Sequence, residues 1–140
     1  MSFYLDANVL VALLTVEPLS GRADSFIASS REPLIVSDLA SAEFSSAIAR
    51  RVRMHESTLA EARADLADFD LWAMRFAQRI ELTPIDIAAA TTYLQRFDLP
   101  LKTPDAIHIA AAQRAGATLV TFDRQMAASA RTLGSRVETP

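Results

Sequence analysis

The sequence contains no cysteine, only three glycines, and a single asparagine and a single lysine. Without cysteine the chain can form neither disulfides nor thiolate metal sites, which suits a reducing compartment. No apolar run is long enough to span a bilayer, and residues 1–10 lack the basic start of a signal peptide. We therefore expect a cytoplasmic protein that does not associate with membranes.

The residues that are present are typical of one compact domain over residues 1–140. Hydrophobic residues make up 51% of the chain, enough to bury a sizeable core. The formal net charge of −3 argues at first against a nucleic-acid partner, because phosphates attract positive surface. That argument is weak if four of the 17 acids share one site, because the other 13 then face 14 bases.

Strand and helix patterns alternate along the whole chain. Short apolar stretches predict strands over residues 2–5, 33–36, 79–82, 117–122 and 136–138. Helical periodicity and capping residues predict helices over 8–15, 21–30, 38–53, 56–78, from 84 onward, 104–115 and 124–133. Because parallel neighbours need crossover connections, the alternation predicts an α/β fold with a central parallel sheet of four to five strands and helices on both faces.

Four acids fall where such a sheet places its ligands, at the carboxyl ends of the strands. Asp6 follows the first strand and Asp123 follows the fourth. Asp105 lies in the first turn of one helix, and Glu43 lies in the second turn of another. All four positions face the same edge of a parallel sheet. We therefore expect the four carboxylates to meet in one cleft.

Acids gathered in this way call for a cation. Two like charges a few ångströms apart repel by roughly 4 kcal/mol at an effective dielectric of about 20, so the site must bind protons or a positive ion. Oxygen-only ligands select hard ions such as Mg²⁺ or Mn²⁺, and the chain has no cysteine or histidine cluster for Zn²⁺.

Helix capping is the alternative explanation for three of these acids. Asp6 and Asp123 could cap the helices that follow them, and Asp105 could be a first-turn acid that the helix dipole favours. Glu43 has no capping role, because it lies within a helix among small and apolar residues. Asp38 is expected to cap that helix and is left out of the site.

Four motifs together resemble one known family. They are "YLDANVL" at 4–10, "SAEFSSAIAR" at 41–50, "TPDAIHIAAA" at 103–112 and "LVTFD" at 119–123. Their order and spacing, and the length of the chain, resemble PIN-domain proteins, and more closely the VapC-type toxins of bacterial toxin–antitoxin pairs. Each motif is weak alone, but the combination is specific.

The resemblance implies a metal-dependent endoribonuclease that hydrolyses RNA with a metal-activated water. Asp6 and Asp105 would be the main ligands of Mg²⁺ or Mn²⁺. Glu43 would bind the ion directly or through water, and Asp123 would hold a second ion or a bound water. The products would carry 5′-phosphate and 3′-hydroxyl ends. The resemblance also implies a homodimer and a cognate VapB-type antitoxin as partner.

Three residues beside the acids have expected supporting roles. Asn8 and Thr121 are expected to orient a carboxylate or a water, although Thr121 equally suits a strand as a β-branched residue. His108 lies one turn past Asp105, and we expect it to pack or to hydrogen-bond nearby rather than to bind metal.

Two clusters outside the site each have two explanations. Basic residues near the end of a helix could grip phosphates, but the helix dipole also favours them there: Arg50, Arg51 and Arg53. An aromatic stripe on a long helix is more often core, although in this family part of it could line the antitoxin groove: Phe69, Trp72 and Phe76.

Three rival functions are disfavoured. A phosphotransfer domain needs a lysine at its site, and Lys102 is the only one and precedes a helix rather than following a late strand. A non-catalytic binding module would not need all four acids. A flap-cleaving DNA nuclease usually carries extra helices for duplex DNA, for which 140 residues leave no room.

Overall fold

A computed structural model describes residues 1–140 and contains one five-stranded parallel sheet in the order β3-β2-β1-β4-β5. The strands are β1 (Phe3–Leu5), β2 (Leu34–Ser37), β3 (Ala77–Ile80), β4 (Thr118–Val120) and β5 (Val137–Glu138). The first strand lies in the middle, with Phe3 paired to Leu34 on one side and to Thr118 on the other. The predicted α/β fold with a parallel sheet of four to five strands is confirmed.

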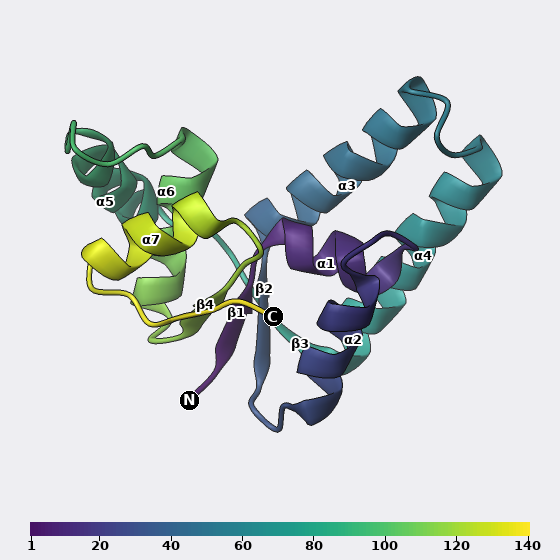
Figure 1. Cartoon of the computed structure of the whole chain (residues 1–140), viewed down its shortest axis with the longest axis horizontal. Helices are drawn as coiled ribbons and strands as arrows, with labels where there is room; N and C mark the ends of the chain where they lie inside the picture. Colours follow the sequence, from purple (N-terminus) through teal and green to yellow (C-terminus); the bar gives the residue numbers. More distant parts are fainter.

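Seven helices cover the two faces of the sheet (Figure 1). They are α1 (Ala7–Leu14), α2 (Ser20–Ser29), α3 (Asp38–Arg53), α4 (Leu59–Phe76), α5 (Pro84–Leu94), α6 (Thr103–Arg114) and α7 (Arg124–Thr132). Side-chain alternation along β1 separates two cores. Leu5 packs with residues of α1, α3 and α4, whereas Tyr4 packs with residues of α6 and α7. No helix combines the length and the apolar composition that crossing a bilayer requires.

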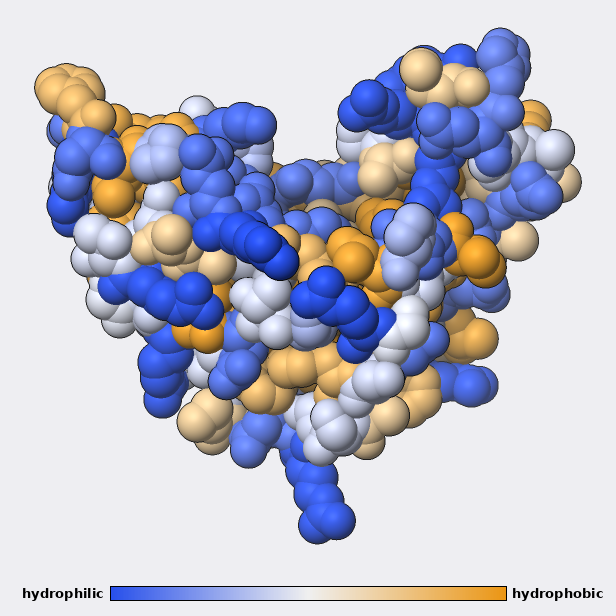
Figure 2. All heavy atoms as spheres, in the orientation of Figure 1, coloured by the Kyte–Doolittle hydropathy of each residue, from blue (hydrophilic) through white to orange (hydrophobic).

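The carboxyl end of β1 lies between two lobes of the molecule. The hairpin of α3 and α4 projects on one side, and α5, α6 and α7 form the other (Figure 1). Phe44 and Phe69 stack at a centroid distance of 4.5 Å and hold the hairpin together. Figure 2 shows that the surface is hollowed between the two lobes.

Predicted boundaries around the hairpin need correction. The fourth helix begins at Leu59 rather than 56, because Thr58 and Glu61 form a capping box there. It ends at Phe76, so β3 occupies residues 77–80 rather than 79–82. The expectation that Asp38 caps α3 is also wrong. Ser37 is the cap and accepts the Ala40 N–H, while Asp38 accepts the N–H of Leu82.

Candidate active site

Asp6 follows β1 directly and is only 6% exposed. It occupies the position before α1, but its side chain makes no capping hydrogen bond, so the capping explanation is wrong for this residue. Its Oδ2 instead accepts a hydrogen bond of 2.7 Å from the Thr121 hydroxyl. Burial raises the pKa of Asp6, and the Glu43 charge adds to the rise, whereas His108 and Thr121 oppose it. The fold therefore holds a carboxyl group that is costly to ionise without a cation.

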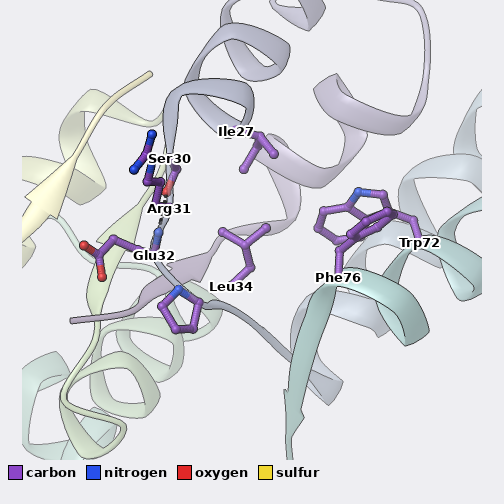
Figure 3. A pocket seen from close by; sticks show the side chains of 8 residues that line it. Ile27, Ser30, Arg31, Glu32, Leu34, Trp72 and Phe76 are labelled. Carbon is purple, nitrogen blue, oxygen red and sulfur yellow. Dashed lines mark hydrogen bonds between the residues drawn. The ribbon is translucent and has the colours of Figure 1, made fainter.

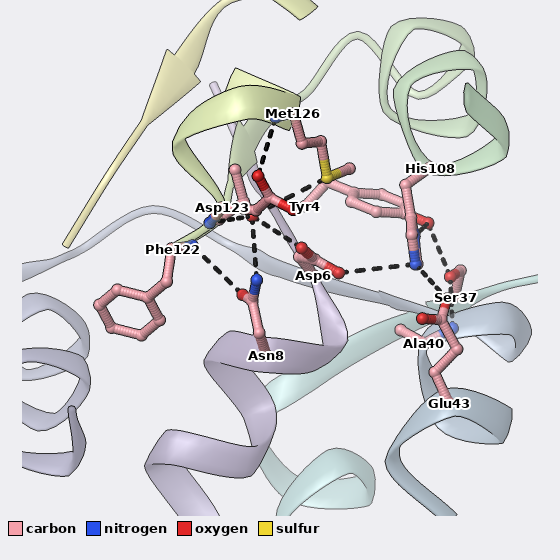
Figure 4. Close-up of polar contacts among 11 residues, drawn as sticks. Tyr4, Asp6, Asn8, Ser37, Ala40, Glu43, His108, Phe122, Asp123 and Met126 are labelled. Atoms are coloured by element: carbon pink, nitrogen blue, oxygen red, sulfur yellow. Dashed lines mark hydrogen bonds and ion pairs between the residues drawn. The ribbon is translucent and has the colours of Figure 1, made fainter. Parts of the chain in front are cut away.

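Thr121 orients this carboxylate, and Asn8, labelled beside Asp6 in Figure 4, holds Thr121. The Thr121 hydroxyl donates to Asp6 and accepts from the Asp123 N–H at 3.0 Å and from Asn8 Nδ2 at 3.2 Å. Asn8 Oδ1 in turn accepts the N–H of Phe122 at 3.2 Å. The Thr121 hydroxyl also lies 3.9 Å from Met126 Sδ, but the 2.7 Å contact with the Asp6 carboxylate is the shorter one and has the stronger acceptor.

Glu43 reaches the same neighbourhood from the second turn of α3. Its Oε1 lies 2.6 Å from His108 Nε2, and that nitrogen is 3.6 Å from Asp6 Oδ1. Burial alone would lower the pKa of His108, but the hydrogen bond to Glu43 and the charges of Asp6 and Glu43 outweigh it and raise the pKa. His108 therefore hydrogen-bonds near the acids, as the sequence predicted.

Asp105 and Asp123 complete the group of acids. Burial raises the pKa of Asp105, and the charges of Asp123 and Asp6 raise it further, so both acids act on Asp105. Asp123 Oδ1 accepts the Met126 N–H at 2.9 Å and caps α7. The capping explanation therefore holds for Asp123, although it does not exclude a second role for the same side chain.

The chemistry of these residues fits a hard divalent ion. As the side chains lie, no group of three or more acids and histidines is arranged around a common point to hold a metal. In this arrangement Glu43 bonds His108, and Asp123 caps α7. The donors are nevertheless carboxylate oxygens whose pKa values are raised by burial at Asp6 and Asp105. A divalent cation would relieve both penalties, and the ligand roles of the four acids stay a prediction.

Sequence reasoning missed two members of the site, Tyr4 and the side-chain role of Ser37. The Tyr4 hydroxyl lies 2.7 Å from Ser37 Oγ and 2.7 Å from His108 Nδ1. Burial raises the pKa of Tyr4 far above its ordinary value of 10.0, so the hydroxyl stays protonated. One signal was available: Tyr4 places a hydroxyl in the middle of an otherwise apolar strand, where it needs a partner.

The metal-free protein is expected to lose stability as the pH rises above the ordinary pKa values of Asp6, Asp105 and His108. Raised pKa values of Asp6 and Asp105 (ordinary value 3.8) and of His108 (ordinary value 6.5) mean that the folded state binds protons more tightly than the unfolded chain. The stability that they contribute is complete below those ordinary values and is lost as the pH passes the raised ones.

Thermal unfolding in the presence of EDTA, followed across this pH range, measures the effect. An Asp6→Asn variant lacks one of the three titrating groups and should show a shallower decline. Equal slopes for the variant and the wild type would contradict the prediction.

Comparison with known proteins shows the family of this chain. The family model described as PIN domain matches residues 3–131. Ribonuclease VapC46 of Mycobacterium tuberculosis is 34% identical over a 142-residue alignment, which covers 99% of this chain and 98% of that protein. The resemblance inferred from the four motifs is thereby confirmed.

Two solved structures share the fold at lower identity. VapC20 of Mycobacterium tuberculosis, a sarcin-ricin loop cleaving toxin, superposes with a TM-score of 0.75 at 19% identity and covers 91% of this chain and 95% of its own. DNA-bound VapBC from Salmonella typhimurium gives a TM-score of 0.72 at 20% identity and covers 99% and 98%. With the family model spanning most of the sequence, the chain belongs to the PIN-domain family.

Proposed function

We propose that this chain is a Mg²⁺- or Mn²⁺-dependent endoribonuclease that acts as the toxin of a VapBC-type pair. The observation that carries the proposal is the buried Asp6 carboxylate. Burial and the nearby Glu43 charge raise the pKa of Asp6, and the Asp6 charge in turn raises the pKa of Asp105. A fold that keeps such a group ionised at neutral pH needs a cation. The 34% identity to a ribonuclease over nearly the whole chain supports RNA as the substrate.

Each residue of the candidate site has a proposed role. Asp6 and Asp105 would hold the ion, with Glu43 and Asp123 beside them. When bound, the ion activates water and stabilises negative charge on the scissile phosphate. Thr121 fixes the Asp6 carboxylate, and Asn8 fixes Thr121, so the acid does not have to be ordered during the reaction.

The proposed partners are RNA, an antitoxin and a second copy of the chain. Support for an antitoxin comes from neighbours such as the DNA-bound VapBC structure. A pocket of about 440 Å³ lies beside α4, and half of its eight lining residues are hydrophobic: Ile27, Leu34, Trp72 and Phe76 (Figure 3). Of the aromatic stripe, Phe69 is core at 3% exposure, whereas Phe76 is 61% exposed and available to a partner.

The arginine cluster lies apart from the carboxylates. The last turn of α3 carries Arg50, Arg51 and Arg53, at the tip of the hairpin in Figure 1. The Arg51 charge lowers the pKa of Asp65, although burial outweighs it there. A neighbouring acid and a helix C-terminus favour the structural explanation of this cluster.

The extent of the PIN domain and the cellular location of the protein are part of the same proposal. A single PIN domain over residues 1–140 is supported by β5, which lies beyond residue 131 and extends the sheet. An enzyme that cuts cellular RNA meets its substrate in the cytoplasm, which we propose as its location.

Cleavage of RNA in the presence of Mn²⁺ or Mg²⁺ tests the function. We expect endonucleolytic cuts that leave 5′-phosphate and 3′-hydroxyl ends, no cutting with EDTA, and no cutting of DNA of the same sequence. Single-stranded and structured RNAs should be compared in parallel, with end groups identified by mass spectrometry. Cleavage that survives EDTA, or that leaves 2′,3′-cyclic ends, would refute the mechanism.

A further inference from the structure

A chain of four polar side chains connects the interior of the sheet to Glu43 (Figure 4). Ser37 Oγ lies 2.7 Å from the Tyr4 hydroxyl, which lies 2.7 Å from His108 Nδ1. The other ring nitrogen, Nε2, lies 2.6 Å from Glu43 Oε1. The first three side chains are at most 1% exposed. They come from β2, β1 and α6, so three separate elements converge on one carboxylate from α3.

The donor and acceptor capacity of each group determines which atom donates the hydrogen bond between His108 and Glu43. An ionised carboxylate only accepts, so His108 Nε2 must carry a hydrogen that points at Glu43. Ser37 Oγ already accepts the N–H of Ala40 and is anchored to the first turn of α3. The two hydroxyls can turn together to serve Nδ1 as donor or as acceptor. The contact with Nδ1 can therefore be kept in either charge state of His108.

Glu43 depends on this contact for its position. Its side chain is 35% exposed, and His108 is its only hydrogen-bond partner. The same Nε2 is 3.6 Å from Asp6 Oδ1, so one donor stands between the two acids. Without it, the two carboxylates would have no donor between them, and we expect the Glu43 side chain to turn to solvent.

We propose that His108, held by Tyr4 and Ser37, is a positioning residue that keeps the Glu43 side chain beside Asp6 in the metal-free protein, so that both acids are at hand when the ion binds. The inference rests on the proposed function, in which Asp6 and Glu43 serve a metal. It adds that affinity for the ion depends on a buried residue that does not touch it.

Calorimetric titration of the metal-free protein with Mn²⁺, without RNA, tests the proposal. Replacing His108 with Leu should weaken Mn²⁺ binding by about 10- to 100-fold, the usual effect of losing a group that orients a ligand. His108→Gln should recover part of the loss, because its amide N–H can stand where Nε2 stands. Tyr4→Phe removes a single oxygen and should weaken binding by roughly 2- to 10-fold.

Two controls separate positioning from general damage to the fold. Ile109→Val trims the neighbouring buried residue of α6 and leaves all four polar groups in place, so its Mn²⁺ affinity should equal that of the wild type. In a Glu43→Ala background, His108→Gln should cause no further loss, because the residue acts through Glu43.

Unchanged Mn²⁺ affinity in both His108→Leu and Tyr4→Phe would overturn the proposal, as would a full additional loss from His108→Gln in the Glu43→Ala background. The readout is independent of catalysis. A protein that cuts no RNA but loses Mn²⁺ affinity in this pattern would refute the proposed function and keep this inference.

Discussion

Replacing Asp6 with Asn is expected to lower RNA cleavage by roughly 1,000-fold, because a metal site contributes several kcal/mol of transition-state stabilisation. The variant keeps the shape of the side chain, and its amide oxygen can still accept the Thr121 hydroxyl that now binds Oδ2. The charge that would hold the ion is lost. Initial rates of cleavage of one labelled RNA at saturating Mn²⁺ measure the effect.

Stability provides the check that the Asp6→Asn loss is chemical. Burial raises the pKa of Asp6, so the ionised side chain destabilises the metal-free fold at neutral pH. The variant should therefore melt at or above the wild-type temperature in EDTA while its activity is lost.

Asp38→Asn is the matched control for this substitution. Asp38 follows β2 as Asp6 follows β1, but it binds the N–H of Leu82 outside the site. This variant should cleave RNA at close to the wild-type rate. If both variants lost activity equally, or if Asp6→Asn cleaved normally, Asp6 would have no special role.

Replacing Arg114 with Met is expected to lower the free energy of unfolding by roughly 2–3 kcal/mol, somewhat less than the loss of a fully buried partner because the arginine is partly exposed. Arg114 Nε and Nη2 bind Asp86 at 2.7 and 3.0 Å, and Nη2 also binds the Glu81 carbonyl. Asp86 is 1% exposed, so the substitution leaves a buried acid with only Thr83 as donor.

The destabilisation should depend on pH in a defined direction. Burial alone would raise the pKa of Asp86, but the hydrogen bonds from Arg114 and Thr83 outweigh it and lower the pKa below its ordinary 3.8. The stability from this contact is therefore present above that ordinary value and is lost as the pH falls through the lowered one. Urea unfolding of Arg114→Met and wild type at neutral and acidic pH measures both the loss and its trend.

Arg96→Met is the control for the ion pair. It breaks an exposed pair with Asp98, at 2.8 Å, and should leave the unfolding curve unchanged. The Asp86–Arg114 contact joins α5 to α6, the helix that carries Asp105. A destabilisation no larger than that of Arg96→Met would mean that the contact contributes little to holding this helix in place.

The sequence predicted the layers and the edge of the sheet well, because these depend on local periodicity and on the rules of parallel crossovers. Residues 3–10 alone were enough to place Asp6 at the carboxyl end of a buried strand. The position of a residue in the chain, however, does not determine the direction in which its side chain points. Glu43 was expected to bind an ion directly or through water, and nothing in its local pattern indicated that it also bonds His108, 65 positions further along the chain.

Residues far apart in the chain account for what sequence reasoning missed. Tyr4 and His108 are separated by 104 positions, and their contact exists only once β1 and α6 lie on the same face of the sheet. Periodicity identifies each as buried but does not pair them. Local competition was a second source of error: Ser37 and Asp38 are both good caps, and only the position of Leu82 shows which of the two is engaged elsewhere.

The alternation along β1 also limits how this protein can change over time. Tyr4 faces one core, Leu5 faces the other, and Asp6 follows at the edge. Deleting or inserting one residue in this three-residue strand would exchange the two faces and rotate the acid away from its partners at once. Single substitutions in this strand can therefore be tolerated more easily than a change in its length, because the length determines where Asp6 lies.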